Sequence, residues 1–292
     1  MTPDHVGSGG MTPDRLGGGG MTADYLGAQH VVSQLMRESL MDKQVIAGTE
    51  SRIRAMLPNL NVIQIGGLSI MDRGQKALLP LLEEIVANQP RHTQVIGAGP
   101  GVRARHILSV GLDLGLPTGA LATLAAKSSA QNAYMVSCLL ANHGFVYLEA
   151  PFMVQLLPAM LAAARGAVFN GIPPYDLWEH PPALGKIPPH GSDAGAYLVG
   201  EVFGARSVIL VKDVDGLYTA DPKTHRDATF IPEIRAADLL AMQLPTLPVE
   251  GTVLELLTRA KLVRSVRIVN GLVPGNLTRA LAGEPVGTVI RE

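Results

Sequence analysis

The sequence predicts an α/β fold, a three-layer α/β/α sandwich around an open and mostly parallel sheet. Short runs rich in β-branched residues alternate with segments whose apolar residues recur at helical spacing. Glycines follow directly on two of these runs, at 66–67 and at 97–101. Strands that alternate with helices form a parallel sheet covered on both faces, and such sheets bind ligands at the carboxyl ends of their strands.

The first half of the body alternates strands and helices. Val62, Ile63 and Ile65 make a β-branched run, and apolar residues from Ala77 to Ile85 recur at helical spacing. We therefore expect, in chain order, a strand at 61–65, a helix near 74–88, a strand at 94–99, a helix near 102–114, and a long helix within 121–144 that ends at Gly144.

The second half continues the alternation with one interruption. Residues 172–193 carry six prolines, which predicts an irregular loop. The other expected elements are a strand at 145–150, a helix at 153–165, a strand at 166–171, a helix near 193–204, a strand at 207–213, and a C-terminal helix–strand–helix.

Three decapeptides open the chain: "MTPDHVGSGG", "MTPDRLGGGG" and "MTADYLGAQH". They hold eight of the 32 glycines and few residues that would build a core, which predicts a disordered Gly-rich tail over 1–30. A docking arm is the alternative. Residues 31–58 are expected to form an extension, with a polar helix over 31–50 that is either peripheral or an oligomer contact. We expect residues 59–292 to fold as a single domain.

Composition excludes several classes of function. The net charge is −1 with no basic stripe, and aromatic residues make up 4%, so nothing favours nucleic acid or an anionic membrane. The longest apolar stretch, 152–164, is broken by Gln155 and Pro158 and is too short to span a bilayer. Cys138 is the only cysteine, which excludes an internal disulfide. With no evident signal peptide, we expect a cytoplasmic protein.

The 47% of hydrophobic residues is compatible with a large buried interface between subunits, and equally with a core rich in Ala and Leu. Enzyme signatures of other kinds are missing from the sequence. No His, Cys and Asp spacing resembles a dedicated Zn²⁺ site, and no Ser-His-Asp pattern or GxSxG elbow occurs.

Two glycine turns predict an anion-binding site. Gly66 and Gly67 end the strand 61–65, where the lack of a side chain allows backbone N–H groups to approach a phosphate. The second turn, within "GAGPGVRARH" at 97–106, leads into a helix whose N-terminus favours anions, although a plain strand-to-helix turn has the same pattern. The candidate oxyanion-binding residues there are Gly97, Gly99, Gly101, Arg103, Arg105 and His106.

The segments 212–234 and 266–290 resemble the amino-acid-kinase family, and its uridylate-kinase branch in particular. The resemblance rests on "DVDGLYTADP", with "SDAGA" upstream and "PG…GEPVGT" downstream. It implies the amino-acid-kinase fold and an ATP site. By this resemblance Asp193 organises the phosphate site. The nucleotide-binding residues it implies are Gly66, Gly67, Asp193, Lys212, Asp215, Gly216, Tyr218, Asp221 and Pro222.

Within the family the chain is most similar to members that store molybdate or tungstate, and to their beta-type chain. The similarity covers about 60–290 and includes "MDRG", "PPYDLW", "VKDVDGLYTA" and "NGLVPGNLTRALAGE". The acidic, methionine-rich "D-x-M-G-M" patch with which uridylate kinases hold uridine is absent near 113–120, which argues against UMP as a substrate.

Two departures from the family pattern bear on catalysis. Gln64 stands where the kinases and the storage members have a lysine, and one positioned electrostatic donor contributes about 10²–10³-fold in rate. Lys212 stands where the alpha-type storage chain has a carboxylate associated with Mg²⁺. An ammonium cannot bind Mg²⁺, although it can contact a phosphate. We therefore expect ATP binding, with weak or absent phosphoryl transfer by this chain.

The resemblance also implies polyoxometalate clusters enclosed in a hexameric cage. Glu149 matches an alpha-type cluster ligand, whereas Met160 and Asp176 replace its two histidines. Other residues could take their place: His180 and His190 as protonatable groups, and Gln131 and Asn132 as hydrogen-bond donors. Alternatively, Glu149 is a solvated carboxylate at a strand end, and the two histidines are exposed loop residues.

The sequence is compatible with three functions. The preferred one is a molybdate or tungstate storage subunit that binds ATP, with Mg²⁺ as the expected companion ion, in a hexamer that is homomeric or includes a sister subunit. The second is a nucleotide or metabolite kinase of the uridylate-kinase type. The third is a catalytically weak partner subunit that only completes such a cage.

Overall fold

The computed structural model describes residues 53–173, 191–220, 225 and 227–292. The decapeptide repeats, the helix expected over 31–50 and most of the proline-rich loop lie outside the described residues. So do five of the candidate or comparison positions in the predicted sites: Asp176, His180, His190, Asp221 and Pro222.

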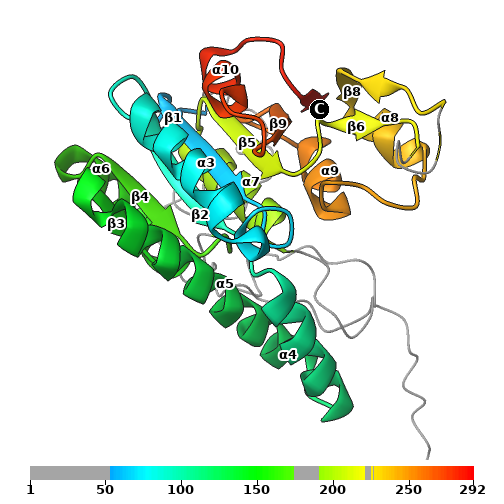
Figure 1. Cartoon of the computed structure of the whole chain (residues 1–292), viewed down its shortest axis with the longest axis horizontal. Coiled ribbons are helices and arrows are strands. Elements are labelled where there is room, and N and C mark those ends of the chain that lie inside the picture. Colours follow the sequence, from blue (N-terminus) through cyan, green and yellow to red (C-terminus); the bar gives the residue numbers. More distant parts are fainter. Residues whose placement is uncertain (1–52, 174–190, 221–224, 226) are drawn as a thin grey trace, which may run out of the picture. The chain divides into compact units, whose positions relative to one another are not determined.

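The centre of the fold is an eight-stranded sheet with the strand order β3-β4-β2-β1-β5-β9-β10-β8 (Figure 1). The six strands from β3 to β9 in this order run parallel, and β10 pairs with β9 in the antiparallel direction. The strands are β1 (Leu60–Ile65), β2 (Thr93–Ala98), β3 (Phe145–Tyr147), β4 (Gly166–Phe169), β5 (Ser207–Lys212), β8 (Glu233–Arg235), β9 (Ser265–Asn270) and β10 (Thr288–Arg291).

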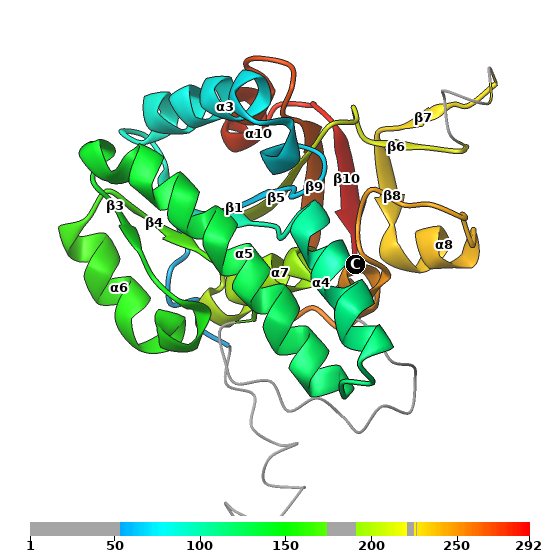
Figure 2. The same ribbon diagram turned by 60° about the horizontal axis from the view of Figure 1, so that its bottom comes forward.

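The sheet is buried on both faces, as β1 illustrates. All six of its residues are buried, with Leu60 and Val62 in one core cluster and Ile63 and Ile65 in the other. Alternate side chains of a strand point to opposite faces, so a strand that is apolar throughout needs cover on both. Helices supply this cover in the three-layer α/β/α arrangement that the sequence predicts (Figure 2).

One face carries α3, α5 and α10, and the other carries α6, α7, α8 and α9. Three short 3₁₀ turns join them: η2 (Met71–Arg73), η3 (Ala141–His143) and η4 (Ala150–Phe152). The helices are α3 (Gln75–Asn88), α4 (Val102–Asp113), α5 (Thr118–Leu140), α6 (Met153–Ala163), α7 (Ser192–Phe203), α8 (Ala236–Ala241), α9 (Gly251–Leu257) and α10 (Asn276–Ala282).

The C-terminal prediction of helix–strand–helix is incomplete. A further strand, β10, follows α10, and its Thr288 and Ile290 side chains are buried on the sheet. A two-stranded ribbon of β6 (Leu217–Tyr218) and β7 (Phe230–Ile231) also lies outside the main sheet. The strand expected at 145–150 stops at Tyr147, because Ala150 already begins η4 and Pro151 has no N–H for the ladder.

The helix α5 is the longest described element. It ends at Leu140, and the chain continues through η3 to Gly144, whose φ of 78° supplies the left-handed stop expected there. Helix α4 and the first turns of α5 extend beyond the edge of the sheet (Figures 1 and 2). No helix among the described residues combines the length and the apolar character needed to cross a bilayer.

Candidate functional site

The candidate site lies where β1, β2 and β5 end side by side. Hydrogen bonds continue the strand pairing into the two glycine turns: Gly66 N donates to Val211 O at 3.0 Å, and Gly99 N donates to Ile65 O at 2.9 Å. The two predicted anion turns therefore lie together at the carboxyl edge of the sheet, as expected for a parallel α/β fold.

The two turns pack backbone against backbone. A Cβ atom at Gly67 would lie 2.2 Å from the Gly101 nitrogen, and one at Gly99 would lie 2.8 Å from the Gly67 nitrogen. Gly101 also has a φ of 70°, a conformation that favours glycine. These glycines are therefore needed first for the close contact of the two turns.

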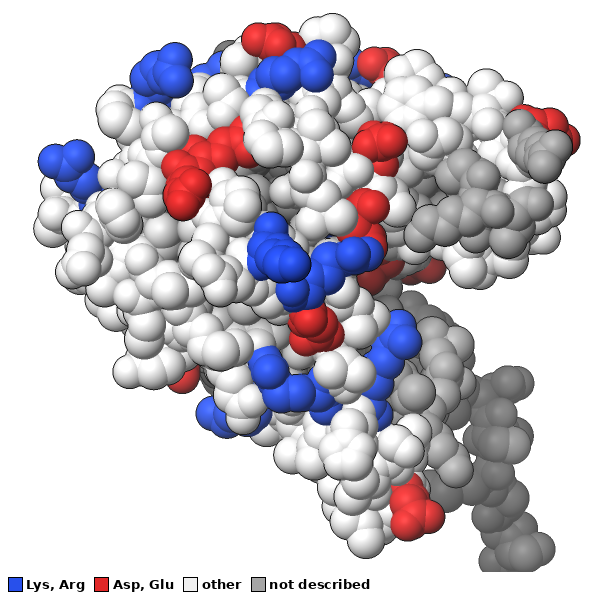
Figure 3. Space-filling view, viewed as in Figure 1, with Lys and Arg blue, Asp and Glu red and all other residues white. Residues whose placement is uncertain are grey.

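The N-terminus of α4 already carries a carboxylate. Asp72 Oδ2 accepts a hydrogen bond from Val102 N at 2.6 Å, where the sequence predicts an anion-favouring helix end. Arg103, Arg105 and His106 are exposed on the first turn of this helix. The Asp72 carboxylate offsets part of the positive potential that an external anion would meet at this helix end. Figure 3 shows basic and acidic side chains interspersed over one face of the molecule.

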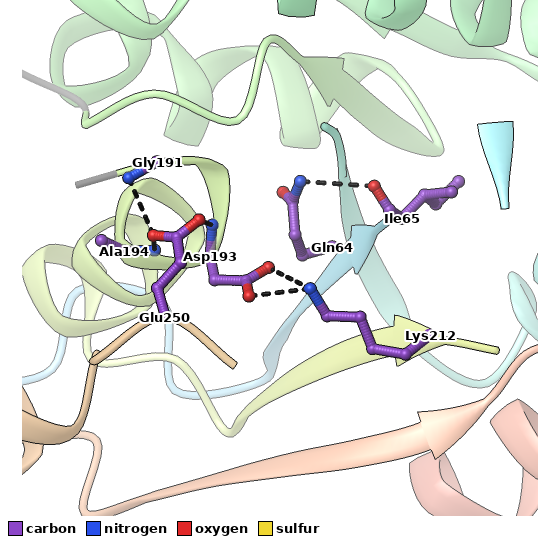
Figure 4. Close-up of polar contacts among 7 residues, drawn as sticks. All are labelled: Gln64, Ile65, Gly191, Asp193, Ala194, Lys212 and Glu250. Carbon is purple, nitrogen blue, oxygen red and sulfur yellow. Dashed lines mark hydrogen bonds and ion pairs between the residues drawn. The ribbon is translucent and has the colours of Figure 1, made fainter. Parts of the chain in front are cut away.

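Gln64 is fully buried on β1. Its amide lies against Gly97, where a Cβ atom would come within 2.0 Å of Gln64 Oε1. Its Nε2 donates to Ile65 O at 3.4 Å, a long hydrogen bond, and Oε1 has no hydrogen-bond partner among the described residues (Figure 4). The position where the family pattern has a lysine is therefore occupied by a neutral, incompletely bonded amide.

Lys212, at the end of β5, forms an ion pair with Asp193 in the first turn of α7 (Figure 4). Its Nζ lies 2.8 Å from Oδ1 and 2.7 Å from Oδ2. The side chains are 15% and 3% exposed, respectively. Because Asp193 is almost fully buried, its charge requires this partner, and the ammonium is correspondingly less available to an external anion.

A second carboxylate, Glu250, lies behind this ion pair. It accepts hydrogen bonds from Gly191 N at 2.8 Å, Asp193 N at 3.0 Å and Ala194 N at 3.1 Å, and so caps the N-terminus of α7 (Figure 4). Burial raises the pKa of Glu250 above its usual value, and the nearby Asp193 carboxylate raises this pKa further, while the three N–H donors oppose both effects.

A pocket of about 790 Å³ is lined mainly by the segment that follows Lys212 and the segment that precedes Glu250 in the chain. One side is residues 213–220, here called the strand-side wall, and the other is residues 244–248, called the loop-side wall. The predicted nucleotide residues Asp215, Gly216 and Tyr218 all belong to the strand-side wall. The volume of the pocket is within the range of small-molecule sites.

Several contacts fix the strand-side wall. Asn270 Nδ2 donates to Asp215 Oδ1 at 2.8 Å, and Arg73 pairs with Asp213. The ring of Tyr218 packs edge-on against Phe230, with centroids 5.4 Å apart. The wall thus offers backbone and amide groups together with an aromatic edge, a combination that suits a base and a ribose.

The proposed cluster residues that the structure describes, Gln131, Asn132 and Glu149, do not line this pocket. Gln131 and Glu149 are exposed, on α5 and directly before η4. Asn132 is fully buried, and its Nδ2 donates to Gly99 O at 2.6 Å, so its amide already supports the second glycine turn. Within the described part of the chain, no group of three or more His, Cys, Asp or Glu side chains is placed to hold a metal ion.

Sequence reasoning missed four features of the site: Asp72, Glu250, Asn270 and the loop-side wall. Asp72 and Glu250 cap helices that begin 30 and 58 residues away from them, and no local pattern signals such contacts. The loop-side wall had a visible signal, since "LPTLP" at 244–248 is proline-punctuated.

The sequence model described as "Amino acid kinase family" matches residues 59–272. This chain belongs to the amino acid kinase family. Among the relatives of this kinase-family chain is the molybdenum storage protein subunit beta of Azotobacter vinelandii, which is 49% identical over 88% of this chain and 95% of its own. The uridylate kinase of Hyperthermus butylicus is 29% identical over 74% of this chain and 89% of its own.

Solved structures of the family agree on the fold. The uridylate kinase of Archaeoglobus fulgidus superposes with a TM-score of 0.62 at 19% identity, covering 79% of this chain and 99% of that one. The UMP kinase of Bacillus anthracis gives a TM-score of 0.63 at 17% identity, with 80% and 96% covered. These findings confirm the predicted amino-acid-kinase fold and the resemblance to the storage branch.

Proposed function

We propose that this chain is a subunit of a cytoplasmic molybdate or tungstate storage protein that binds ATP and helps to enclose polyoxometalate clusters in an oligomeric cage. The hexamer proposed for it is homomeric or includes a sister subunit. The similarity to the molybdenum storage subunit beta over nearly the whole of both chains supports this function. One observation favours binding over catalysis. Position 64 holds a buried neutral amide, and the cation on the neighbouring strand, Lys212, is already paired with Asp193.

This arrangement suits binding more than phosphoryl transfer. Transfer requires donors and cations aimed at the charge that develops on the phosphoryl group. Gln64 offers one weakly bonded N–H and no charge, and Lys212 makes both of its short contacts to Asp193. Molybdate and tungstate are tetrahedral oxyanions like phosphate, so a site of phosphate type is a reasonable origin for an oxometalate site.

The pocket and its walls fit a nucleotide, and we assign ATP to them. Asp215, Gly216 and Tyr218 would hold the base and ribose. Asp221 and Pro222, which lie outside the described residues, are proposed as further nucleotide contacts. The glycine turns with Asp193 and Lys212 would face the phosphates. Mg²⁺ would enter with the phosphates, since it binds mainly to phosphate oxygens and water; Asp213 and Asp215 already have partners in Arg73 and Asn270.

For the cluster we keep Glu149, Gln131, His180 and His190 as proposed contacts. Glu149 and Gln131 are exposed and therefore accessible to a large anion. Burial raises the pKa of Tyr147, and the negative charge of Glu149 raises it further. The Glu149 charge therefore acts on this edge of the sheet. Asn132 fits the cluster less well, because its amide already bonds Gly99.

In vitro loading tests this function. The purified metal-free chain is incubated with molybdate or tungstate, with and without ATP and Mg²⁺, and the metal that elutes with the protein in size-exclusion chromatography is counted. We expect several metal atoms per chain, with more in the presence of ATP. Retention of less than one atom per chain under all conditions would contradict the storage function.

A nucleotide or metabolite kinase is the second candidate. The 790 Å³ pocket and the structural likeness to uridylate kinases favour it. It differs in what it predicts: ADP release that depends on UMP or another acceptor, and that is unaffected by molybdate. A catalytically weak partner subunit would show neither this turnover nor storage until the sister chain is added.

A further inference from the structure

The two walls of the nucleotide pocket are connected through contacts that Lys212 and Glu250 both make with Asp193. The strand-side wall begins directly after Lys212, and the loop-side wall ends two residues before Glu250. Lys212 Nζ binds the Asp193 carboxylate, and the Glu250 carboxylate binds the backbone N–H of Asp193. The first turn of α7 is therefore the shared support of both walls.

Glu250, two residues after the loop-side wall, links this wall to the start of α7 through hydrogen bonds. Its two oxygens take three N–H groups at the helix start, where an α-helix leaves N–H groups without partners of its own. These three hydrogen bonds fix the start of α7 relative to the Glu250 carboxyl group. The position of the Asp193 carboxylate thus depends on where Glu250, and the loop before it, is held.

We propose that Glu250 is a positioning residue that couples occupancy of the nucleotide pocket to the Asp193–Lys212 ion pair. The proposal rests on the nucleotide site assigned above. A ligand bound between the two walls restrains the motion of both. Because Lys212 adjoins one wall and Glu250 the other, and both contact Asp193, the first turn of α7 is restrained as well. Coupling of this kind is reciprocal, so a change at Glu250 alters ligand affinity as well as the dynamics of both walls.

The same helix provides a matched control. Glu201, in the last turns of α7, also caps a chain segment, with its carboxylate accepting from Lys261 N, Leu262 N and Val263 N. None of these residues lines the pocket. Glu201→Gln therefore removes the same chemistry from the same helix at a place where coupling to the pocket is not expected.

Amide hydrogen exchange of the ligand-free protein tests the coupling directly. Both Glu250→Gln and Glu201→Gln are expected to lower the melting temperature, because a glutamine amide can turn only one acceptor toward the N–H groups. Glu250→Gln should raise exchange at 191–195 and also at 213–218, by about tenfold, roughly the loss of one charge-assisted hydrogen bond. Glu201→Gln should raise exchange near 261–263 only.

Nucleotide affinity gives the second readout. We expect Glu250→Gln to weaken binding of a fluorescent ATP analogue by about fivefold or more, the lower end of typical coupling between sites, and Glu201→Gln to leave it unchanged. Equal exchange at 213–218 in the two variants would overturn the proposal. If the wild-type chain binds no ATP but exchange at 213–218 still responds only to Glu250→Gln, the coupling stands and the nucleotide assignment fails.

A third variant covers the case in which Glu250→Gln does not fold. Glu250→Asp keeps the charge but shortens the side chain by one methylene, so it should fold and show a smaller rise of exchange at 191–195 and 213–218. A rise confined to 191–195 in this variant would also overturn the proposal, because it would show that the cap supports α7 alone.

Discussion

Lys212 and Asp193 form a two-contact ion pair at the carboxyl edge of the sheet, with Nζ 2.7 Å and 2.8 Å from the two carboxylate oxygens. The aspartate is 3% exposed, so its charge depends on this lysine. The neutral Gln64 is buried on the neighbouring strand β1. On the function proposed above, these two features together account for weak phosphoryl transfer.

Removal of the lysine should destabilise the protein. In Lys212→Met the Asp193 carboxylate stays buried beside Glu250 without a cation, and a broken buried pair costs about 3–5 kcal/mol in the free energy of unfolding. We expect the low end, because Lys212 is 15% exposed. In urea unfolding, the double variant Lys212→Met with Asp193→Asn should recover part of the free energy of unfolding that Lys212→Met loses. If the changes of the two single variants simply add in the double variant, the ion pair does not contribute as described.

A lysine at position 64 should restore the positive charge that Gln64 lacks and raise ATP turnover. Gln64→Lys places a second ammonium on β1, the strand that pairs with β5 and its Lys212. We expect ATP turnover to rise by tenfold or more, towards the about 10²–10³-fold of one positioned donor. Gln64→Met, which is similar in size but neutral, is the control and should not raise turnover. If steady-state ADP release is the same in both variants, the lost cation does not explain the weak transfer expected here.

Glycine at position 67 should be required for the contact between the two turns. Gly67→Ala places a methyl 2.2 Å from the Gly101 nitrogen, a backbone atom, and overpacking of this kind costs about 1–3 kcal/mol. Gly119→Ala is the control: position 119 lies in α5 with nothing within 4 Å of its Cβ. In thermal unfolding, Gly67→Ala should lower the free energy of unfolding. Gly119→Ala should raise it by about 0.5–1 kcal/mol.

The raised pKa of Glu250 predicts a pH dependence of stability. Between the usual carboxyl pKa and the raised value, the folded protein binds more protons than the unfolded chain, so the contribution of Glu250 to the free energy of unfolding falls as pH rises through this window. Melting temperatures of wild type and Glu250→Gln should therefore be compared from about pH 4.5 to about pH 7.5.

The expected result is that the wild-type advantage over Glu250→Gln shrinks with rising pH. The charged group that acts on Glu250 from a neighbouring element is Asp193 on α7, and Asp193 is itself paired with Lys212 on β5. An advantage that grows with pH would show that the three N–H donors outweigh burial and lower the pKa instead.

Much of the fold followed from local sequence patterns. The β-branched runs of β1 and β5 and the apolar spacing of α3 gave the right elements, because strands buried on both faces must be apolar throughout. The antiparallel strand β10 was not predicted although "TVIR" has strand character, because the expected C-terminal helix–strand–helix left no element after its second helix. Short β6 and β7 have only two residues each, too few for a periodic signal.

The site was predicted only in part. Motif glycines and the Asp193 position could be found because each belongs to a local turn or helix start. The ion pair with Lys212 and the caps by Asp72 and Glu250 join residues that are 19 to 57 positions apart. Contacts at that separation depend on which strands are neighbours in the sheet, which a single sequence does not specify.

The metal content of the protein as isolated tests the central claim most directly. Cells that produce the full chain are grown with molybdate or with tungstate, and the purified protein is analysed for both elements by mass spectrometry. The storage function predicts many Mo or W atoms per chain that survive gel filtration. Less than one atom per chain, together with UMP-dependent release of ADP, would contradict it and identify a nucleotide kinase instead.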